Sequence, residues 1–328
     1  MKKKKRIVSG MRPTGPLHLG NLHGAIANWI DMQNRYDCLF FIADWHALTS
    51  DYEKTDSIND NINNMILDWL SAGLSPELCT MFVQSHVKEH AELFLLLSMI
   101  TPVPWLERNP TYKDQIVQMD NKDLSTFGFL GYPVLQTADI ILYKADVVPV
   151  GIDQVPHIEI AREIARRFNY LYTNVFPEPE SMLTKSSKIL GIDRRKMSKS
   201  YNNAIYLSDN PDEVISKISK MITDPQRARK NDPGNPDICN VFEFHKLYSD
   251  SDSVETINKE CRIAKIGCVD CKKIMSKNLL NFLEPIHNKR KDYKNRPDFI
   301  ADIIRAGCNR ARGIAEKTME EVRRAVKI

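Results

Sequence analysis

The feature that most constrains the fold is a short apolar segment that runs through a glycine- and proline-rich turn into a helical pattern. Residues 6–11 (RIVSGM) predict a buried parallel strand, and 23–36 have apolar residues at helical spacing. The turn between them contains Gly10, Pro13, Gly15, Pro16 and Gly20. A strand that enters a helix through such a turn leaves backbone N–H groups unpaired at the helix N-terminus, which suits phosphate. His18 and Asn21 add side-chain donors there, although His18 could instead serve only as a helix cap.

A second segment also has the composition of a phosphate-binding loop. Residues 196–200 read KMSKS, with Lys196 and Lys199 three residues apart. Two such lysines can close over a triphosphate and neutralise the charge that develops on departing pyrophosphate. A Lys/Ser run alone is more often a solvated loop. Its pairing with the His18 turn predicts one nucleotide site formed by both segments.

Strands and helices alternate along the first half of the chain, up to about Phe176. The predicted strands are 39–43, 81–84 and 147–150, and the predicted helices are 58–70, 91–100 and 156–168. This alternation predicts an α/β fold with a doubly wound parallel (Rossmann-type) sheet, whose ligands bind at the carboxyl ends of the strands. The polar segment 105–131 interrupts the alternation and is predicted to be an insertion.

Past Asn202 the strand patterns stop, and helical spacing continues to the end of the chain. The predicted helices are 212–223, 254–266, 271–283 and 297–326. We therefore expect a sheet-containing domain at 1–206 and an all-helical C-terminal domain at 207–328.

One predicted helix carries polar residues suited to an amino-acid pocket. Tyr132, Gln136 and Asp139 lie at i, i+4 and i+7, so they share one face. The Asp139 carboxylate can accept one hydrogen bond from an indole N–H or from a phenol O–H. Tyr132 and Gln136, together with Gln154, can hold an ammonium group. The alternative is a helix whose polar residues face solvent.

Two further segments follow predicted strands. Gly151 and Asp153 come directly after 147–150, where Gly151 allows close approach and Asp153 could accept from ribose hydroxyls. His46 follows 39–43 and is either a packed core residue or a minor candidate for the site.

Charge is unevenly distributed along a chain whose formal net charge is +4. Residues 259–328 contain 18 Lys and Arg but 9 Asp and Glu, which suits a polyanion such as RNA. A solvated helical surface is the alternative.

No apolar run approaches the ~20 residues that span a bilayer, and no apolar region follows the basic residues 2–6 as in a signal peptide. The cytoplasm is therefore the expected location, with no membrane association.

Four of the seven cysteines lie close together in the sequence, at Cys239, Cys261, Cys268 and Cys271. Disulfides are not expected in the cytoplasm. A CxxC pair with two further cysteines nearby predicts four thiolates around a metal, and zinc or a [4Fe–4S] cluster would accept that set. Ordinary buried cysteines are the alternative.

These motifs, in this order, resemble those of class I aminoacyl-tRNA synthetases, and most closely those of the bacterial tryptophanyl-tRNA synthetases. Residues 18–21 are similar to the H-x-G-H signature of the class, with Asn21 in the last place, and 196–200 match its KMSKS signature. The segments 9–15, 43–47, 132–139 and 148–154 also match in order. The resemblance runs nearly from end to end.

The resemblance implies activation of L-tryptophan by ATP with Mg²⁺ and transfer of tryptophan to tRNA(Trp). It implies that Asp139 reads the indole nitrogen, that 105–131 is a connective insertion which contributes to a homodimer interface, and that 207–328 receives the anticodon. The implied catalytic residues are His18, Asn21, Lys196 and Lys199. The implied ATP-binding residues are Arg12, Thr14, Gly20, Asn21, Gly151, Asp153, Lys196, Met197, Ser198 and Lys199.

A subset of this family has a closely similar cysteine pattern and binds a [4Fe–4S] cluster, so the resemblance implies that cluster here, with zinc as the alternative. Three other functions remain open. The chain could be a tyrosyl synthetase, a small-molecule nucleotidyltransferase with a similar turn, or a synthetase-like protein that binds RNA or nucleotides without catalysis.

Overall fold

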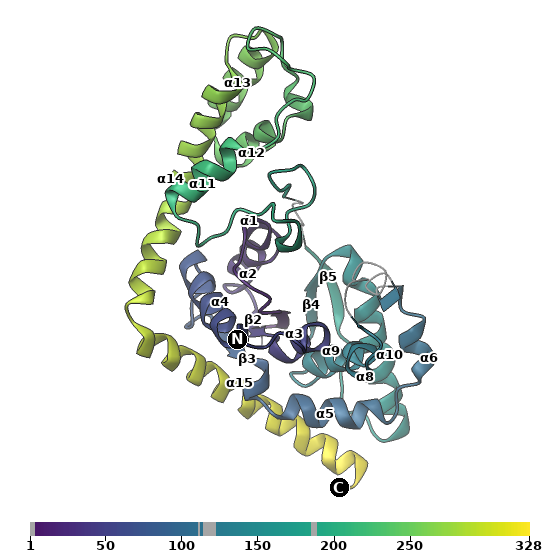
Figure 1. The fold of residues 1–328 in the computed structure, drawn as a ribbon. Coiled ribbons are helices and arrows are strands. Elements are labelled where there is room, and N and C mark those ends of the chain that lie inside the picture. The colour runs from purple at the N-terminus through teal and green to yellow at the C-terminus, as the bar shows by residue number, and fades with distance from the viewer. Residues whose placement is uncertain (1–3, 111, 114–122, 185–188) are drawn as a thin grey trace.

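The sheet is the organising element of the fold in this computed structural model, which describes residues 4–110, 112–113, 123–184 and 189–328 (Figure 1). Its strands are β1 (Arg6–Met11), β2 (Asp37–Ile42), β3 (Cys79–Val83), β4 (Val147–Val150) and β5 (Glu180–Leu183). All pair in parallel, in the order β3-β2-β1-β4-β5. The predicted doubly wound parallel sheet is therefore confirmed, and the chain order reverses between β1 and β4.

Helices cover the sheet and continue past it to the C-terminus. In the first half of the chain they are α1 (Leu19–Asn21), a π-helical turn (Leu22–Ile26), α2 (Ala27–Met32), α3 (Asp44–Asp51), α4 (Ile58–Ala72), α5 (Glu89–Ser98), α6 (Val103–Glu107), α8 (Phe127–Leu130), α9 (Tyr132–Ile141) and α10 (Val155–Leu171). Towards the C-terminus they are α11 (Pro211–Ser219), α12 (Asn240–Tyr248), α13 (Ser251–Arg262), α14 (Cys268–Lys294) and α15 (Pro297–Val326). The predicted insertion at 105–131 lies partly outside the described residues, at 111 and 114–122.

The first helix begins at Leu19, not at residue 23 as predicted, because His18 caps it. The His18 side chain accepts a hydrogen bond from the Asn21 N–H, and the Asn21 side chain accepts one from the His18 N–H. This reciprocal capping box satisfies two backbone donors of the first turn. Gly20 therefore lies in the helix and not in the preceding turn.

Several elements had no counterpart in the sequence prediction, among them β5, α3 and α12. Strand β5 is mostly exposed, so it carries no apolar run. Helix α3 begins directly after β2, and its residues are only weakly segregated into polar and apolar faces. Helix α12 follows Cys239, in a stretch that was assigned no element.

Of the C-terminal helices, α14 and α15 pack back onto the part of the chain that contains the sheet, whereas α12 and α13 extend away from it (Figure 1). Helix α14 lies along α4, where Arg290 donates to Asp68 Oδ1 at 2.7 Å, and α15 crosses β3. A Cβ atom at Gly307 would lie 1.8 Å from the carbonyl oxygen of Met81, so only glycine permits this approach of helix to strand. Within the described residues, no helix is both long and apolar enough to cross a membrane.

Candidate active site

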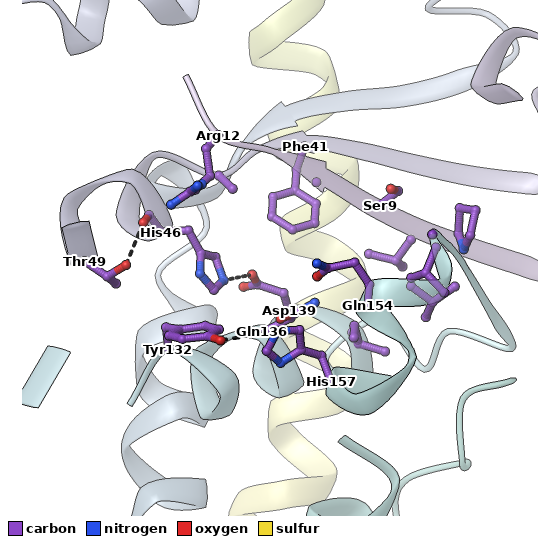
Figure 2. Close-up of a pocket in the computed structure, with 18 residues that line it drawn as sticks. Ser9, Arg12, Phe41, His46, Thr49, Tyr132, Gln136, Asp139, Gln154 and His157 are labelled. Atoms are coloured by element: carbon purple, nitrogen blue, oxygen red, sulfur yellow. Dashed lines mark hydrogen bonds and ion pairs between the residues drawn. The ribbon is translucent and has the colours of Figure 1, made fainter. Parts of the chain in front are cut away.

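A cavity of about 380 Å³ opens at the point where the order of the strands reverses. Its walls come from β1 (Val8, Ser9, Gly10), from β4 and the residues after it, and from α3, α9 and α10. Ligands of doubly wound sheets bind at this switch point, beyond the carboxyl ends of the strands. Figure 2 shows the side chains of Arg12, His46, Tyr132, Asp139 and His157 gathered around it.

Asp139, on α9, is a charged acceptor although it is only 1% exposed. His90 Nδ1 and Gln84 Nε2 each donate to Oδ1 at 2.7 Å, and His46 Nε2 donates to Oδ2 at 2.8 Å. Burial would raise the pKa of this carboxyl, but hydrogen bonds and charge from the two histidines hold the pKa below its ordinary value. Each carboxylate oxygen can accept two hydrogen bonds, so Oδ2 retains one acceptor position beside the cavity.

Tyr132 shares the α9 face with Asp139 and is held by a histidine that the sequence analysis did not identify. Asn109 Nδ2 lies 3.0 Å from His157 Nδ1, and His157 Nε2 lies 3.3 Å from the Tyr132 hydroxyl. Burial, and then the charge of His46, lowers the pKa of His157 to about 4, so its ring is neutral at pH 7. Because Asn109 donates to Nδ1, the ring proton sits on Nε2 and points to the Tyr132 oxygen. The Tyr132 oxygen keeps a second lone pair that can accept a further hydrogen bond.

The remaining predicted pocket residues lie around the same cavity. Gln136 and Gln154 line it, as do Arg12 and Gly151. Gln154 Nε2 donates to Asp153 Oδ2 at 3.0 Å, and a Cβ atom at Gly151 would lie 2.6 Å from Asp153 Oδ1. The missing side chain at Gly151 therefore lets the Asp153 carboxylate lie against the backbone there, and Asp153 itself does not line the cavity.

The turn after β1 and the 196–200 segment meet in space. Lys199 Nζ donates to the Gly15 carbonyl oxygen at 2.8 Å, and the pKa of its amine is lowered to about 8, chiefly by burial. Burial, followed by the charges of Lys199 and Lys196, lowers the pKa of His18 to about 4. His18 is thus a neutral donor at pH 7, and since Nδ1 accepts from Asn21, the ring proton is on Nε2.

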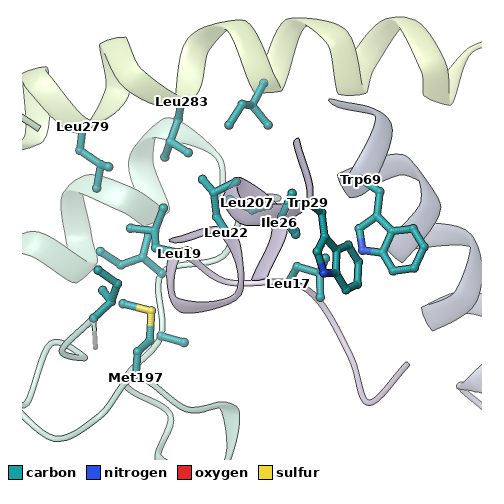
Figure 3. Packing of buried hydrophobic residues seen from close by; sticks show 14 of the residues in the cluster. Leu17, Leu19, Leu22, Ile26, Trp29, Trp69, Met197, Leu207, Leu279 and Leu283 are labelled. Atoms are coloured by element: carbon teal, nitrogen blue, oxygen red, sulfur yellow. The ribbon is translucent and has the colours of Figure 1, made fainter. Parts of the chain in front are cut away.

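Met197 anchors the 196–200 segment to the body of the protein (Figure 3). Its side chain is buried among Leu19, Leu22 and other apolar residues of the core, while Lys196 on one side is exposed. On the other side, the Ser198 N–H donates to Asn203 Oδ1 at 2.8 Å. Met197 therefore serves this segment through packing. Thr14, another predicted ATP-binding residue, is exposed in the turn.

The four cysteines Cys239, Cys261, Cys268 and Cys271 converge at the start of α12, the end of α13 and the start of α14. Arg227 Nη1 lies 3.8 Å from the Cys261 sulfur and 3.9 Å from the Cys268 sulfur. Burial, and then the neighbouring Cys239, Cys261 and Cys268 groups, raises the pKa of Cys271 to about 12. Within the described ranges, no group of three or more His, Cys, Asp or Glu side chains has the arrangement that holds a single metal ion.

Comparison with known proteins agrees with this geometry. A sequence model of the family described as tRNA synthetases class I (W and Y) matches residues 1–284. The chain is 50% identical to the tryptophan–tRNA ligase of Thermotoga maritima over 98% of this chain and 99% of that one, and 46% identical to the Aquifex aeolicus enzyme over 98% and 100%. The fold is similar to that of tryptophanyl-tRNA synthetase from Campylobacter jejuni complexed with ADP and tryptophan, with a TM-score of 0.91, 31% identity, and 98% and 100% of the two chains covered.

Proposed function

Because this chain belongs to the class I tRNA synthetases of the tryptophan and tyrosine group, we propose how its cavity performs the reaction of that family. Its activity is that of a tryptophan–tRNA ligase: L-tryptophan reacts with ATP to give tryptophanyl-AMP and pyrophosphate, and tryptophan then passes to the 3′ end of tRNA(Trp). The observation that carries this activity is the 50% identity to a tryptophan–tRNA ligase over the full length of both chains. It also sets aside the tyrosyl, nucleotidyltransferase and non-catalytic alternatives.

In our proposal the indole N–H donates to the free acceptor position of Asp139 Oδ2. This carboxylate is buried and charged, so an amino acid without a donor at that place leaves it unpaired at a high free-energy cost. Tyr132, Gln136 and Gln154 surround the other end of the substrate and hold its ammonium group. Arg12, which lines the same cavity, connects this pocket to the phosphate turn.

The reacting carboxylate of tryptophan is already ionised at neutral pH, so the site needs no general base. ATP enters as its magnesium complex, and the tryptophan carboxylate attacks the α-phosphorus while pyrophosphate leaves. His18 Nε2–H donates to the phosphate, and the ammonium groups of Lys199 and Lys196 stabilise the charge that develops on the leaving group. Asn21 holds His18 in place through the capping box. In this proposal the nucleotide is bordered by the backbone or the short side chains of Gly20, Gly151, Asp153 and Ser198.

Charging of tRNA(Trp) with radiolabelled tryptophan tests this assignment of residues. Asp139→Asn keeps the shape of the side chain but places an amide where a carboxylate accepts. We expect KM for tryptophan to rise about 100-fold or more, with KM for ATP unchanged, because one buried charged acceptor is lost. An unchanged KM for tryptophan would contradict the role of Asp139.

We further propose that residues 207–328 form the tRNA-binding domain. This proposal is supported by the excess of basic side chains after residue 259 and by the helical character of all elements from α11 to α15.

We also propose a homodimer, because Leu95, Met99 and Val103 present large exposed apolar side chains along α5 and α6, which a second copy would cover. Because the charging of tRNA serves translation, we propose that the protein acts in the cytoplasm.

For the four-cysteine cluster we propose a [4Fe–4S] group with a structural or tRNA-facing role. The support is the donor set: four thiols each close enough to influence the pKa of another, with the Arg227 guanidinium beside two of them. Burial raises the pKa of Cys261 and Cys271, and the charge of Arg227 opposes this rise. A single zinc ion would need the four sulfurs drawn into one tetrahedron, roughly 3.8 Å apart for Zn–S bonds of about 2.3 Å. When bound, the cluster would hold α12, α13 and α14 together.

Anaerobic purification followed by iron, sulfide and zinc analysis tests this cofactor. About four irons per chain support the cluster, and Cys268→Ser with Cys271→Ser should remove them. Stoichiometric zinc, or iron retained in the double variant, would contradict it. Cys308→Ser is the matched control, since Cys308 is buried on α15 away from the four, and its iron content should not change.

A further inference from the structure

Behind the tryptophan pocket lies a row of buried polar groups that the mechanism above does not use. His90, on α5, is 0% exposed, and its Nε2 lies 2.7 Å from the hydroxyl of Tyr143. Its Nδ1 lies 2.7 Å from Asp139 Oδ1. Tyr143 is also fully buried, one turn beyond Asp139 in the chain. None of these atoms other than those of Asp139 lines the cavity.

The direction of the hydrogen bond between His90 and Asp139 follows from the chemistry of the groups. A carboxylate only accepts, so His90 Nδ1 carries the proton that it shares with Asp139. The other ring nitrogen, Nε2, pairs with the Tyr143 hydroxyl, which can donate or accept. Both nitrogen atoms of the His90 ring therefore have a hydrogen-bond partner, which fixes the orientation of the ring.

The consequence for Asp139 is geometric. Its Oδ1 atom already accepts from His90 and Gln84, both at 2.7 Å, so this oxygen has no position left for a substrate. The carboxylate plane is therefore held with Oδ2 toward His46 and the cavity. Without the His90 contact, Gln84 alone would hold Oδ1, and the carboxylate plane could tilt about the terminal bond of Asp139, because that torsion is broad.

We propose that His90 and Tyr143 are positioning residues for amino-acid selection, which lock the Asp139 carboxylate so that a single acceptor meets the indole N–H. This inference rests on the proposed role of Asp139 in binding the indole. His90 and Tyr143 touch no substrate, and their effect is transmitted through Asp139 alone. A site with one fixed acceptor distinguishes a ligand with an N–H from an isostere without it.

The test is amino-acid-dependent ATP–pyrophosphate exchange with tryptophan and with β-(3-benzothienyl)alanine, in which sulfur replaces the indole N–H. The measured quantity is the ratio of kcat/KM for the two amino acids. We expect His90→Leu to lower this ratio about tenfold or more, and Tyr143→Phe to lower it less. His90→Asn should preserve most of the ratio, because its amide nitrogen occupies the place of Nδ1.

Thr137→Val is the matched control. Thr137 is buried on the same helix, and its hydroxyl donates to the Pro133 carbonyl oxygen at 2.8 Å, away from Asp139. We expect Thr137→Val to leave the ratio of kcat/KM unchanged. We also expect KM for ATP to stay unchanged in all of these variants. An unchanged ratio in both His90→Leu and Tyr143→Phe overturns the proposal. If Asp139→Asn also leaves the ratio unchanged, the proposed role of Asp139 fails instead, so the two failures can be distinguished.

Discussion

Lys199 donates a hydrogen bond of 2.8 Å to the carbonyl oxygen of Gly15, 184 residues earlier in the chain. This contact closes the KMSKS segment over the turn that follows β1. The ammonium of Lys199 thus lies at the turn where phosphate is expected. ATP would replace that carbonyl as the partner of Lys199.

Replacing Lys199 should slow tryptophan activation. Lys199→Met removes the charge and keeps most of the side-chain length, so we expect kcat to fall about 10²- to 10³-fold, the usual effect of removing one group that stabilises a transition state. Pre-steady-state formation of tryptophanyl-AMP measures this directly. The matched control is Lys217→Met: Lys217 pairs with Asp209 outside the cavity, and its loss should leave the rate within twofold.

The pH dependence should identify the same lysine. The pKa of Lys199 is about 8, so its amine is charged below that pH and becomes neutral above it. We expect kcat/KM for ATP to be level at neutral pH and to fall above pH 8, because this parameter reports the free enzyme. In Lys199→Arg the guanidinium stays charged, so this alkaline decline should vanish. A decline at the same pH in the arginine variant would show that another group titrates.

His18 should act as a neutral donor, and two substitutions separate its roles. In His18→Asn the amide oxygen can replace Nδ1 as the acceptor that caps the helix. In His18→Gln the amide N–H lies near the position of Nε2 and can donate in its place. We expect His18→Gln to retain more turnover than His18→Asn, and His18→Asn to retain more thermal stability. Since the pKa of His18 is about 4, acidification from pH 7 to pH 5 should leave its donor role unchanged. Equal turnover in the two variants would contradict donation from Nε2.

The crossing of α15 over β3 can be tested with two glycines of one helix. Gly307→Ala would force a Cβ into the Met81 carbonyl oxygen, so we expect a loss of at least about 1–3 kcal/mol in the free energy of unfolding. Gly313 has no atom within 4 Å of such a Cβ, and Gly313→Ala should stabilise by about 0.5–1 kcal/mol. Urea denaturation gives both values, and similar effects of the two substitutions would contradict the crossing.

Some of this architecture could be predicted because a repeated pattern encodes it. Strands β1 and β4 and helix α15 have the predicted bounds. Strand β4 is an uninterrupted apolar run, β1 is a mostly apolar segment that ends at a proline- and glycine-rich turn, and α15 has a regular helical stripe. Spacing along one helix was enough to bring Tyr132, Gln136 and Asp139 to one cavity. The start of α1 was predicted at residue 23 although His18 had been considered as a helix cap, because histidine is uncommon at that position; the structure confirms the cap.

The residues that support the site were harder to find, because their signal lies in tertiary contacts. His90 sits at the start of an apolar helix, and Gln84 at the end of an apolar strand, where a polar residue usually marks only a boundary. His157 follows Pro156 at the beginning of α10. Each was identified only when the fold brought it to Asp139 or Tyr132. A polar residue at the carboxyl end of a parallel strand was the one available signal, and it applied to Gln84.

The most direct test of the account is ATP–pyrophosphate exchange by the wild-type protein, with tryptophan and tyrosine compared at equal concentrations. The account predicts exchange with tryptophan and a rate with tyrosine lower by orders of magnitude, since the cavity of about 380 Å³ places Asp139 to meet an indole N–H. Equal or faster exchange with tyrosine would contradict the assigned selectivity. If neither amino acid supported exchange, the proposed role of the His18 turn and Lys199 in the reaction with ATP would be contradicted.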